Sequence, residues 1–370
     1  MRIGIVTFHR AENFGAVLQC LALSHYLKEI GNEVIILDYR CHSIEKQYKL
    51  INWNLLKPRR IIWKRLIPFI KDLSHYQYKK NRKKAYFDFR QKYFSTTEPI
   101  YKINQIPPNL DVYITGSDQV WNGALTNGID DIYWLNFPVN KNAKKVSFAA
   151  SCETTGYRFL EKEQVKIKEI LKQYCKITVR EEKLKEILYS YSNIKNIDVV
   201  IDPTLLLPKD FYTQLVKRPK EKNYLLVYHL RDIKDINLQE YWKNIAKQKN
   251  LQVIEIRTNF NSRQTVNNKI GTGPEELLSY LYYADYVFTN SFHATILSIL
   301  FHNEFYSVDD GQIARIKNIL KKLELSERII SPDNIPHEIR PIDFKHVDNL
   351  LANLSLLSKN IINSLFLKES

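Results

Sequence analysis

A stretch near residue 290 changes within a few residues from the pattern of an apolar strand to the pattern of a helix. Residues 286–289 (YVFT) predict a short buried strand, Asn290 or Ser291 is a candidate N-cap, and the apolar run that begins at Phe292 predicts a core-packed helix. A buried strand that leads directly into a buried helix is typical of an α/β domain.

His293 falls in the first turn of that expected helix. The free backbone N–H groups and the positive end of the helix dipole favour an anion there, and they oppose a positive charge on the imidazole. We therefore expect a neutral, exposed histidine beside an anion pocket, where it can act as an acid or a base. A capping or packing histidine is the alternative interpretation.

Short apolar segments alternate with helical patterns over most of the chain. The expected strands are 3–8, 34–38, 112–115, 146–150, 176–179, 197–201, 224–230, 251–256, 286–289 and 305–308. A chain of 370 residues is long for one core. We expect an α/β protein of two Rossmann-like domains, residues 1–207 and 208–340, followed by a helical tail over 341–370.

Two loops that follow expected strands carry candidate ligand contacts. The loop 9–16 lacks the G-x-G-x-x-G pattern, so it does not predict a dinucleotide site. Asn13 and Gly15 let the backbone approach a ligand closely or simply form the turn. The second loop, 116–122 (GSDQVWN), is densely polar, and its Asp118 is a candidate ligand contact or helix N-cap.

Two arginines are candidate anion contacts. Arg180 ends the expected strand 176–179 and can clamp a carboxylate or phosphate, or it can pair with Glu181 or Glu182. Arg315 lies on an expected helix over 313–323, after the strand 305–308, and it either contacts an anion or forms a structural ion pair.

The formal net charge is +15, from 55 basic and 40 acidic residues. Thirteen Lys or Arg lie between residues 57 and 92, interleaved with aromatic residues, against only two acidic residues, Asp72 and Asp88. Such a segment predicts contact with an anionic membrane surface, a nucleic acid or an acidic polymer, or a solvated helix face. We favour peripheral membrane contact, and we expect no nucleic acid partner.

Composition narrows the remaining classes. No apolar run approaches the roughly 20 residues of a membrane helix, and the N-terminus runs directly into a strand, so we expect a cytoplasmic protein. The four cysteines are far apart and are expected to be reduced core thiols. No spacing of His or Cys predicts a metal site.

Four blocks occur in a characteristic order. They are TFHRAENFGAVLQ (7–19), YITGSDQVWN (113–122), TVRE (178–181) with DPTLL (202–206), and GPEEL (273–277) with TNSFH (289–293). Together they resemble the polysaccharide pyruvyl transferase family, and the resemblance extends from residue 3 to about residue 325. The family has glycine after the histidine of the last block, where this chain has Ala294.

The resemblance implies two Rossmann-like domains in a GT-B-like arrangement, with the site in the interdomain cleft. It implies transfer of pyruvate from phosphoenolpyruvate, the donor substrate, onto two hydroxyls of a sugar as a cyclic ketal. The acceptor expected is a cell-surface polysaccharide, an exopolysaccharide or capsule, or its lipid-linked precursor. No further cofactor is expected.

Roles for individual residues follow from the resemblance. His293 and Asp118 are the expected catalytic groups. The expected donor-binding residues are Arg180, Arg315, Ser291 and Asn290, and the expected acceptor-binding residues are Asn13, Gly15, Gln19, Ser117, Gln119 and Trp121. The alternative function is a GT-B-like glycosyltransferase with a nucleotide-sugar donor, because a helix N-terminus binds a diphosphate equally well.

Overall fold

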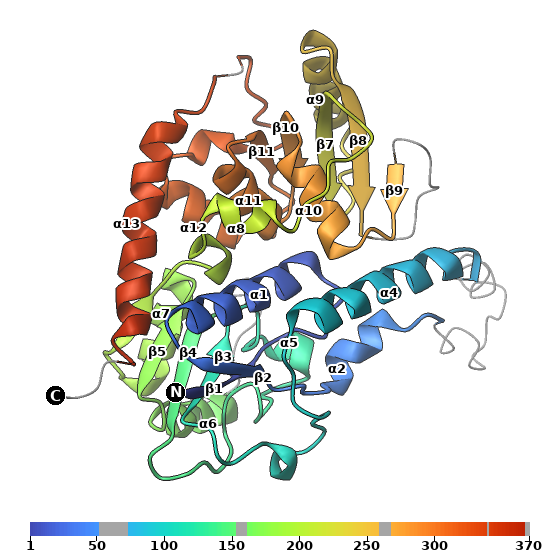
Figure 1. Cartoon of the computed structure of the whole chain (residues 1–370). Helices are drawn as coiled ribbons and strands as arrows, with labels where there is room; N and C mark the ends of the chain where they lie inside the picture. Colours follow the sequence, from blue (N-terminus) through green and yellow to red (C-terminus); the bar gives the residue numbers. More distant parts are fainter. Residues whose placement is uncertain (52–72, 153–160, 259–267, 339, 367–370) are drawn as a thin grey trace, which may run out of the picture. The chain divides into compact units, whose positions relative to one another are not determined.

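The computed structural model describes residues 1–51, 73–152, 161–258, 268–338 and 340–366, which form two compact units (Figure 1). Unit 1 comprises residues 1–46, 90–208 and 345–370, and unit 2 comprises 47–89 and 209–344. The chain leaves the core of unit 1 at residue 208, one residue beyond the expected boundary.

Two further segments join these units, the first of them the expected helical tail and the second the basic segment. The tail helix α13 (Phe344–Asn363) groups with unit 1, where Ser358 Oγ accepts a hydrogen bond from the Ile201 amide at 3.1 Å. The helix α4 (Tyr76–Tyr93) carries the described part of the basic segment, and most of it groups with unit 2. There Arg82 Nη1 donates to the Thr258 carbonyl at 2.7 Å. Residues 57–72 of the basic segment lie outside the described residues.

Unit 1 contains a six-stranded parallel sheet with the order β2-β1-β3-β4-β5-β6. Its strands are β1 (Arg2–Val6), β2 (Glu33–Ile36), β3 (Val112–Gly116), β4 (Lys144–Ala150), β5 (Lys176–Val179) and β6 (Ile197–Val199). Its helices, besides α13, are α1 (Phe14–Glu29), α2 (His42–Glu45), α5 (Gly123–Thr126), α6 (Glu161–Leu171) and α7 (Glu182–Ser192). Gly31 follows α1 with φ 86°, as expected for a glycine that ends a helix.

Unit 2 contains a second six-stranded parallel sheet, with the order β12-β11-β10-β7-β8-β9. Its strands are β7 (Tyr224–His229), β8 (Gln252–Arg257), β9 (Asn268–Ile270), β10 (Tyr286–Thr289), β11 (Glu304–Val308) and β12 (Ile329–Ile330). Its helices, besides α4, are α8 (Lys209–Thr213), α9 (Ile236–Gln248), α10 (Pro274–Tyr282), α11 (Phe292–Phe301) and α12 (Ala314–Lys322). The expected fold of two Rossmann-like domains is therefore confirmed.

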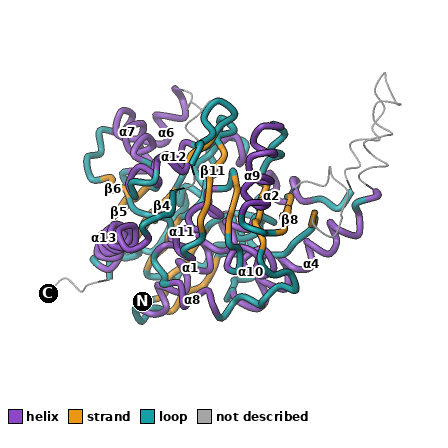
Figure 2. The backbone as a smooth tube through the Cα atoms, turned by 90° about the horizontal axis from the view of Figure 1, so that it is seen from above, coloured by secondary structure: helices purple, strands orange, loops and turns teal. Residues whose placement is uncertain are grey.

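The core of unit 2 lies on both faces of its sheet. Figure 2 shows β8 between α9 on one side and α10 on the other. On the α9 face, Trp242 packs in a buried cluster with Val227 and Phe288 from neighbouring strands. Helix α11 is buried along nearly its whole length, which explains its almost uninterrupted apolar sequence.

Parallel register brings the strand ends of each unit to one edge. In unit 2, Thr289 lies opposite Tyr228 of β7 and Ser307 of β11. The strand order reverses between β7 and β10, and ligands of open α/β sheets bind at such a switch point, beyond the carboxyl ends of the strands. The loops after β7, β10 and β11 therefore form the edge at which a site is expected.

The four cysteines are free thiols in three buried positions and one exposed position. Cys20, Cys41 and Cys152 are buried, as expected, whereas Cys175 is exposed at the turn before β5. The expectation of a core position is therefore wrong for Cys175.

Candidate functional site

The amino end of α11 is built as the sequence predicts. Ser291 is the N-cap, and its hydroxyl accepts a hydrogen bond from the Ala294 amide at 3.4 Å. His293 is the second residue of the helix, and its ring meets Phe292 edge to face at a centroid distance of 5.1 Å. His293 is only 6% exposed, so the expectation of an exposed histidine is wrong. Helix α11 buries its first turn as well as its later turns.

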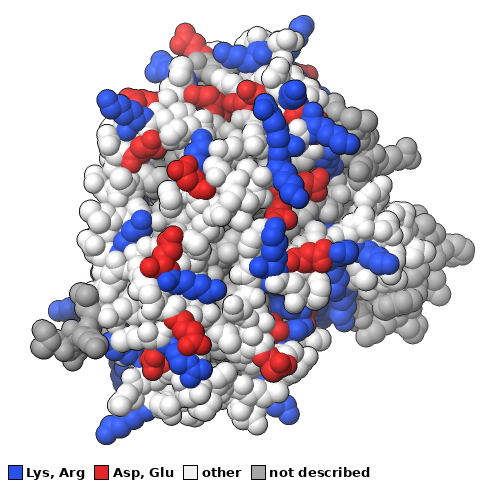
Figure 3. Space-filling model, in the orientation of Figure 1, with Lys and Arg blue, Asp and Glu red and all other residues white. Residues whose placement is uncertain are grey.

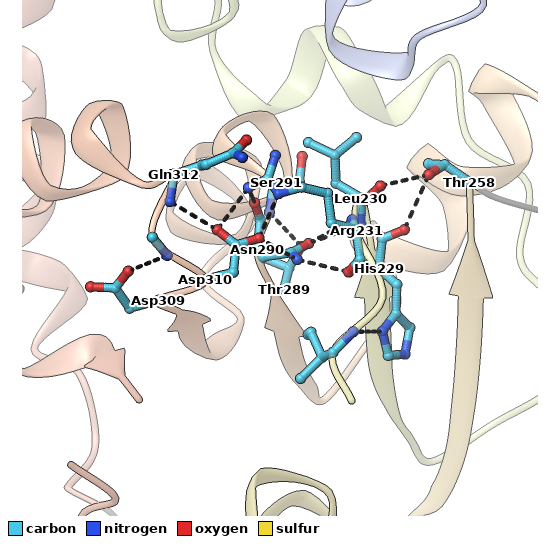
Figure 4. A network of polar contacts seen from close by, with 12 residues as sticks. His229, Leu230, Arg231, Thr258, Thr289, Asn290, Ser291, Asp309, Asp310 and Gln312 are labelled. Carbon is cyan, nitrogen blue, oxygen red and sulfur yellow. Dashed lines mark hydrogen bonds and ion pairs between the residues drawn. The ribbon is translucent and has the colours of Figure 1, made fainter. Parts of the chain in front are cut away.

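Asn290 joins three loops of the unit 2 edge (Figure 4). Its Oδ1 accepts hydrogen bonds from the amides of Leu230 and Arg231, at 2.9 and 3.3 Å. Its Nδ2 donates to the Arg231 carbonyl and to Asp310 Oδ2, both at 2.8 Å. The amide group of Asn290 is thus engaged within the protein, and its expected contact with the donor stays a prediction.

Arg231 is a candidate site residue that the sequence interpretation missed. Its guanidinium forms a two-point ion pair with Asp310, with Nε–Oδ2 at 2.6 Å and Nη2–Oδ1 at 2.9 Å. Its side chain is 35% exposed. Its position directly beyond β7, at the switch point, is the signal that could have identified it.

Arg315 and His293 both contact the aromatic ring of Phe292. Its guanidinium carbon is 5.7 Å from the centroid of the Phe292 ring, the same ring that His293 contacts. The arginine is half-buried at the start of α12. The structure therefore brings two of the predicted residues, His293 and Arg315, onto one aromatic side chain, and the anion-binding role of Arg315 stays a prediction.

Arg180 occupies a buried cluster at the edge of unit 1. Its Nη1 lies 2.6 Å from Asp202 Oδ2, and its Nε lies 3.1 Å from Glu181 Oε1. Burial alone would lower the pKa of Arg180, but the charges of Glu181 and Asp202 outweigh burial and raise it above its usual value. The ion pair with Glu181, one of the two interpretations, is confirmed. Two buried carboxylates offset the charge of the Arg180 guanidinium, so the cluster has no net positive charge that would attract a donor anion.

The predicted residues Gln19 and Ser117 belong to the same buried edge. Gln19 Nε2 donates to Thr7 Oγ1 at 2.9 Å, and Thr7 in turn donates to the Ser117 carbonyl at 3.0 Å. Ser117 Oγ donates to Asp202 Oδ2 at 3.3 Å. Gln19 and Ser117 are both 0% exposed and are engaged within the protein, and their expected contact with an acceptor stays a prediction.

Asp118 has the backbone geometry of a constrained site residue. It is half-buried and adopts a left-handed conformation with φ 69°. Its carboxylate accepts a hydrogen bond from the Gln119 amide at 2.8 Å, and its carbonyl accepts one from Ser151 at 3.0 Å. The N-cap interpretation is wrong, because Asn122 caps α5. The catalytic role of Asp118 stays a prediction.

Trp121 is a core residue. It is 0% exposed and stacks on Trp134 at a centroid distance of 4.5 Å and an interplanar angle of 13°. The ring of Trp121 is therefore covered by the protein, and its expected acceptor contact stays a prediction. Gln119 is half-buried, and its Oε1 accepts from Asn122 Nδ2 at 2.7 Å, so its acceptor role stays a prediction.

The remaining predicted residues lie at the start of α1. Asn13 is its N-cap, and its Oδ1 accepts from the Ala16 amide at 3.2 Å. Gly15 is buried in the first turn of α1, and its expected contact with an acceptor stays a prediction. Asn13 is half-buried, and its contact with an acceptor stays a prediction.

Each unit also carries a buried histidine–carboxylate pair that the sequence interpretation missed. In unit 1, His9 Nε2 lies 2.9 Å from Asp38 Oδ1, and Arg40 pairs with the same carboxylate. In unit 2, His229 Nε2 lies 3.4 Å from Glu255 Oε2, and Arg257 pairs with that carboxylate. In both pairs the arginine is two residues beyond the carboxylate.

Burial and partner charges set the protonation of these pairs. Burial lowers the pKa of His9 and the pKa of His229. Burial would raise the pKa of Asp38, but the hydrogen bond with His9 and the charges of His9, Arg10 and Arg40 lower it to about 2. The carboxylate of Asp38 is thus held charged at the end of β2.

The described surface shows how the basic charge is distributed. On the face drawn in Figure 3, basic and acidic side chains are intermixed. In α4, several of the basic residues are exposed, as in the solvated-face interpretation, and the membrane contact of residues 57–92 stays a prediction. Among the described residues, no helix combines the length and the apolar character needed to cross a membrane.

The two sheets and their polar carboxyl edges define a protein of two Rossmann-like units with candidate anion contacts at the start of α11. A family model described as polysaccharide pyruvyl transferase matches residues 13–312. The chain therefore belongs to the polysaccharide pyruvyl transferase family, a family of transferases that act on polysaccharide, and its acceptor is a sugar.

Solved structures of other proteins are similar at low identity. UDP-GlcNAc 2-epimerase from Neisseria meningitidis, bound to UDP-GlcNAc, is 9% identical with a TM-score of 0.47, over 99% of this chain and 100% of that chain. The glycotransferase of kitacinnamycin is 10% identical with a TM-score of 0.44, over 98% of each chain. A putative UDP-N-acetylglucosamine 2-epimerase from Listeria monocytogenes is 9% identical with a TM-score of 0.46, over 95% and 87%. No curated protein matches the chain significantly.

Proposed function

We propose that the protein transfers pyruvate from phosphoenolpyruvate onto two hydroxyls of a sugar in a cell-surface polysaccharide or its lipid-linked precursor. The single observation that carries the proposal is the family match over residues 13–312. It is supported by the α11 start, where a histidine in the first turn lies beside backbone N–H groups suited to an anion.

The proposed reaction balances in two steps. A first sugar hydroxyl adds to C2 of the enol, C3 gains a proton, and the hydroxyl loses one. The second hydroxyl then attacks C2, the bond from C2 to the phosphate oxygen breaks, and the second hydroxyl proton leaves with phosphate. The products are one cyclic ketal and one inorganic phosphate, so no oxidant or reductant is needed.

In this proposal His293 delivers the proton to C3 or holds the leaving phosphate. The low exposure of its ring suits either role, because proton transfer and electrostatic stabilisation are more effective where water is excluded. Arg315, which contacts the same Phe292 ring, supplies positive charge for the donor. Asp118, on its constrained turn, is the proposed base for a sugar hydroxyl.

The competing donor is a nucleotide sugar. In dinucleotide-binding Rossmann domains, an acidic residue at the end of the second strand binds ribose. The acidic residues nearest that position here are Asp38 and Glu255, and each is engaged by a histidine and an arginine. Their engagement weighs against ribose recognition at these two positions, and so favours phosphoenolpyruvate.

A thermal-shift titration of the full chain tests the donor. We expect phosphoenolpyruvate to raise the melting temperature, since a ligand of the folded state stabilises it, and we expect UDP-sugars to have no effect. His293→Ala is expected to weaken the response, whereas the matched control His302→Ala, at the far end of α11, leaves it unchanged. Stabilisation by a nucleotide sugar alone would assign the protein to glycosyl transfer.

A further inference from the structure

Arg90 is a buried arginine in which two of the three guanidinium nitrogens have no hydrogen-bond partner. The residue lies near the end of α4 and is 7% exposed. Its Nε and Nη1 atoms are both inaccessible to solvent, and neither has a hydrogen-bond partner. Buried guanidinium groups are normally paired, because an unpaired charge loses its hydration without compensation.

The segment after α4 fixes where Arg90 lies. Residues 95–100 run beside the end of β2, with the Ile36 amide donating to the Ser95 carbonyl at 2.8 Å. Farther along, the Ile100 amide donates to the Asp38 carbonyl at 2.9 Å. This pairing anchors the last turn of α4 at the carboxyl end of β2, in unit 1.

Arg90 therefore has charged neighbours, but they are engaged with other groups. It lies within electrostatic range of Arg10, Arg40, Glu12 and Asp38. Asp38 accepts from His9 and from Arg40, at 2.9 and 3.1 Å. Neither Asp38 nor Glu12 forms a hydrogen bond with Nε or Nη1 of Arg90.

Arg10 and Arg40 share a second carboxylate and connect this cluster to solvent. Arg10 Nε lies 3.3 Å and Arg40 Nη1 3.4 Å from Glu45 Oε1. Both side chains are 22% exposed. The two partly exposed guanidinium groups therefore lie on the solvent side of a cluster that includes the buried Arg90.

Burial changes the pKa of Arg90. Burial first, and then the charge of Arg10, lower the pKa of Arg90 to about 10, so the group is still positively charged at neutral pH. A bound anion would supply the missing acceptors and the missing negative charge.

We propose that Arg90, Arg10 and Arg40 form a site for a phosphoryl group at the carboxyl end of β2. A phosphoryl group fits because it carries more than one negative charge and several acceptor oxygens, which suit forked guanidinium donors. The group is free phosphate or belongs to a phosphorylated substrate. The proposal rests on the unpaired guanidinium and does not depend on pyruvyl transfer.

Arg90→Met in the full chain tests the site, because methionine keeps apolar bulk and removes the charge. Binding is measured by calorimetry and thermal shift with inorganic phosphate, phosphoenolpyruvate and a sugar 1-phosphate as separate probes. We expect the wild type to bind at least one probe, and Arg90→Met to bind it about 10- to 100-fold more weakly, as for loss of hydrogen bonds to a charged group. We also expect Arg90→Met to melt higher than the wild type when no anion is present.

Arg328→Met is the matched control. Arg328 is 2% exposed but is paired with Glu304 at 3.1 Å, so its loss is expected to lower stability and to leave anion binding unchanged. The probe with the lowest wild-type Kd distinguishes free phosphate from a donor or sugar phosphate. Equal affinity of the wild type and Arg90→Met, or no binding of any probe by the wild type, overturns the proposal. If Arg90→Met does not fold, Arg10→Met decides, with about 10-fold weaker binding expected and unchanged binding contradicting the site.

Discussion

Asn290 holds Arg231 from both sides, because its side-chain oxygen accepts from the Arg231 amide and its side-chain nitrogen donates to the Arg231 carbonyl. The two contacts measure 3.3 and 2.8 Å and join the loop after β10 to the loop after β7. The side-chain amide of Asn290 therefore links the two loops on either side of the switch point of the unit 2 sheet. The start of α11, whose N-cap Ser291 follows Asn290 directly, is held in place by the same contacts.

Replacing Asn290 by Asp tests this closure. The substitution removes both Nδ2 hydrogen bonds and places a carboxylate oxygen against Asp310, so we expect a loss of about 1–3 kcal/mol in the free energy of unfolding. Urea denaturation measures it. Asn250→Asp, on an exposed turn, is the control and is expected to change stability by less than about 0.5 kcal/mol. Equal stability of the two variants would contradict the role of Asn290.

Asp38 makes stability depend on pH at the acid end. Its folded pKa of about 2 is below the ordinary value of 3.8, so its stabilisation is present above about pH 4 and is lost as the pH falls towards 2. We expect Asp38→Asn to cost about 2 kcal/mol at pH 7 and progressively less below pH 4. Unfolding free energies of wild type and variant at a series of pH values measure this difference. A difference that does not change with pH would exclude the proposed coupling.

Substitutions of Trp121 distinguish a role in the core from a role in ligand binding. Because its ring is fully buried against Trp134, Trp121→Ala is expected to cost about 3–5 kcal/mol of stability. Trp121→Phe is expected to cost less and to keep the KM for the acceptor unchanged once the protein is folded. Denaturation curves and steady-state kinetics measure the two effects. A raised acceptor KM with unchanged stability would instead support contact between Trp121 and the acceptor.

Local sequence patterns predicted the strands and helices whose own residues show apolar periodicity or a helix cap. Tyr286–Thr289, the Ser291 cap and the helix from Phe292 agree with the structure residue for residue. The strand β12 and the strand β9 were missed, because each is two or three residues long and exists through pairing with a distant strand. No local periodicity reports such pairing.

The site was predicted less well, because burial and ion pairing are long-range properties. The sequence marks Arg180 as a strand-end arginine, but not that Asp202, from another loop, neutralises it. It likewise gives no sign that His9 meets Asp38, or that Trp121 stacks on Trp134. The roles that local chemistry suggests for exposed loops hold only for residues that the fold leaves accessible.

The central claim is pyruvyl transfer that depends on His293. The direct measurement incubates the full chain with phosphoenolpyruvate and a panel of oligosaccharide acceptors in deuterated water, followed by mass spectrometry and phosphate assay. The account predicts one phosphate released for each ketal formed and a deuterium in the ketal methyl group. It predicts a loss of at least about 100-fold in rate for His293→Ala and little change for His302→Ala, as for removal of a general acid. Product formed only from a nucleotide sugar, or an unchanged rate in His293→Ala, would contradict it.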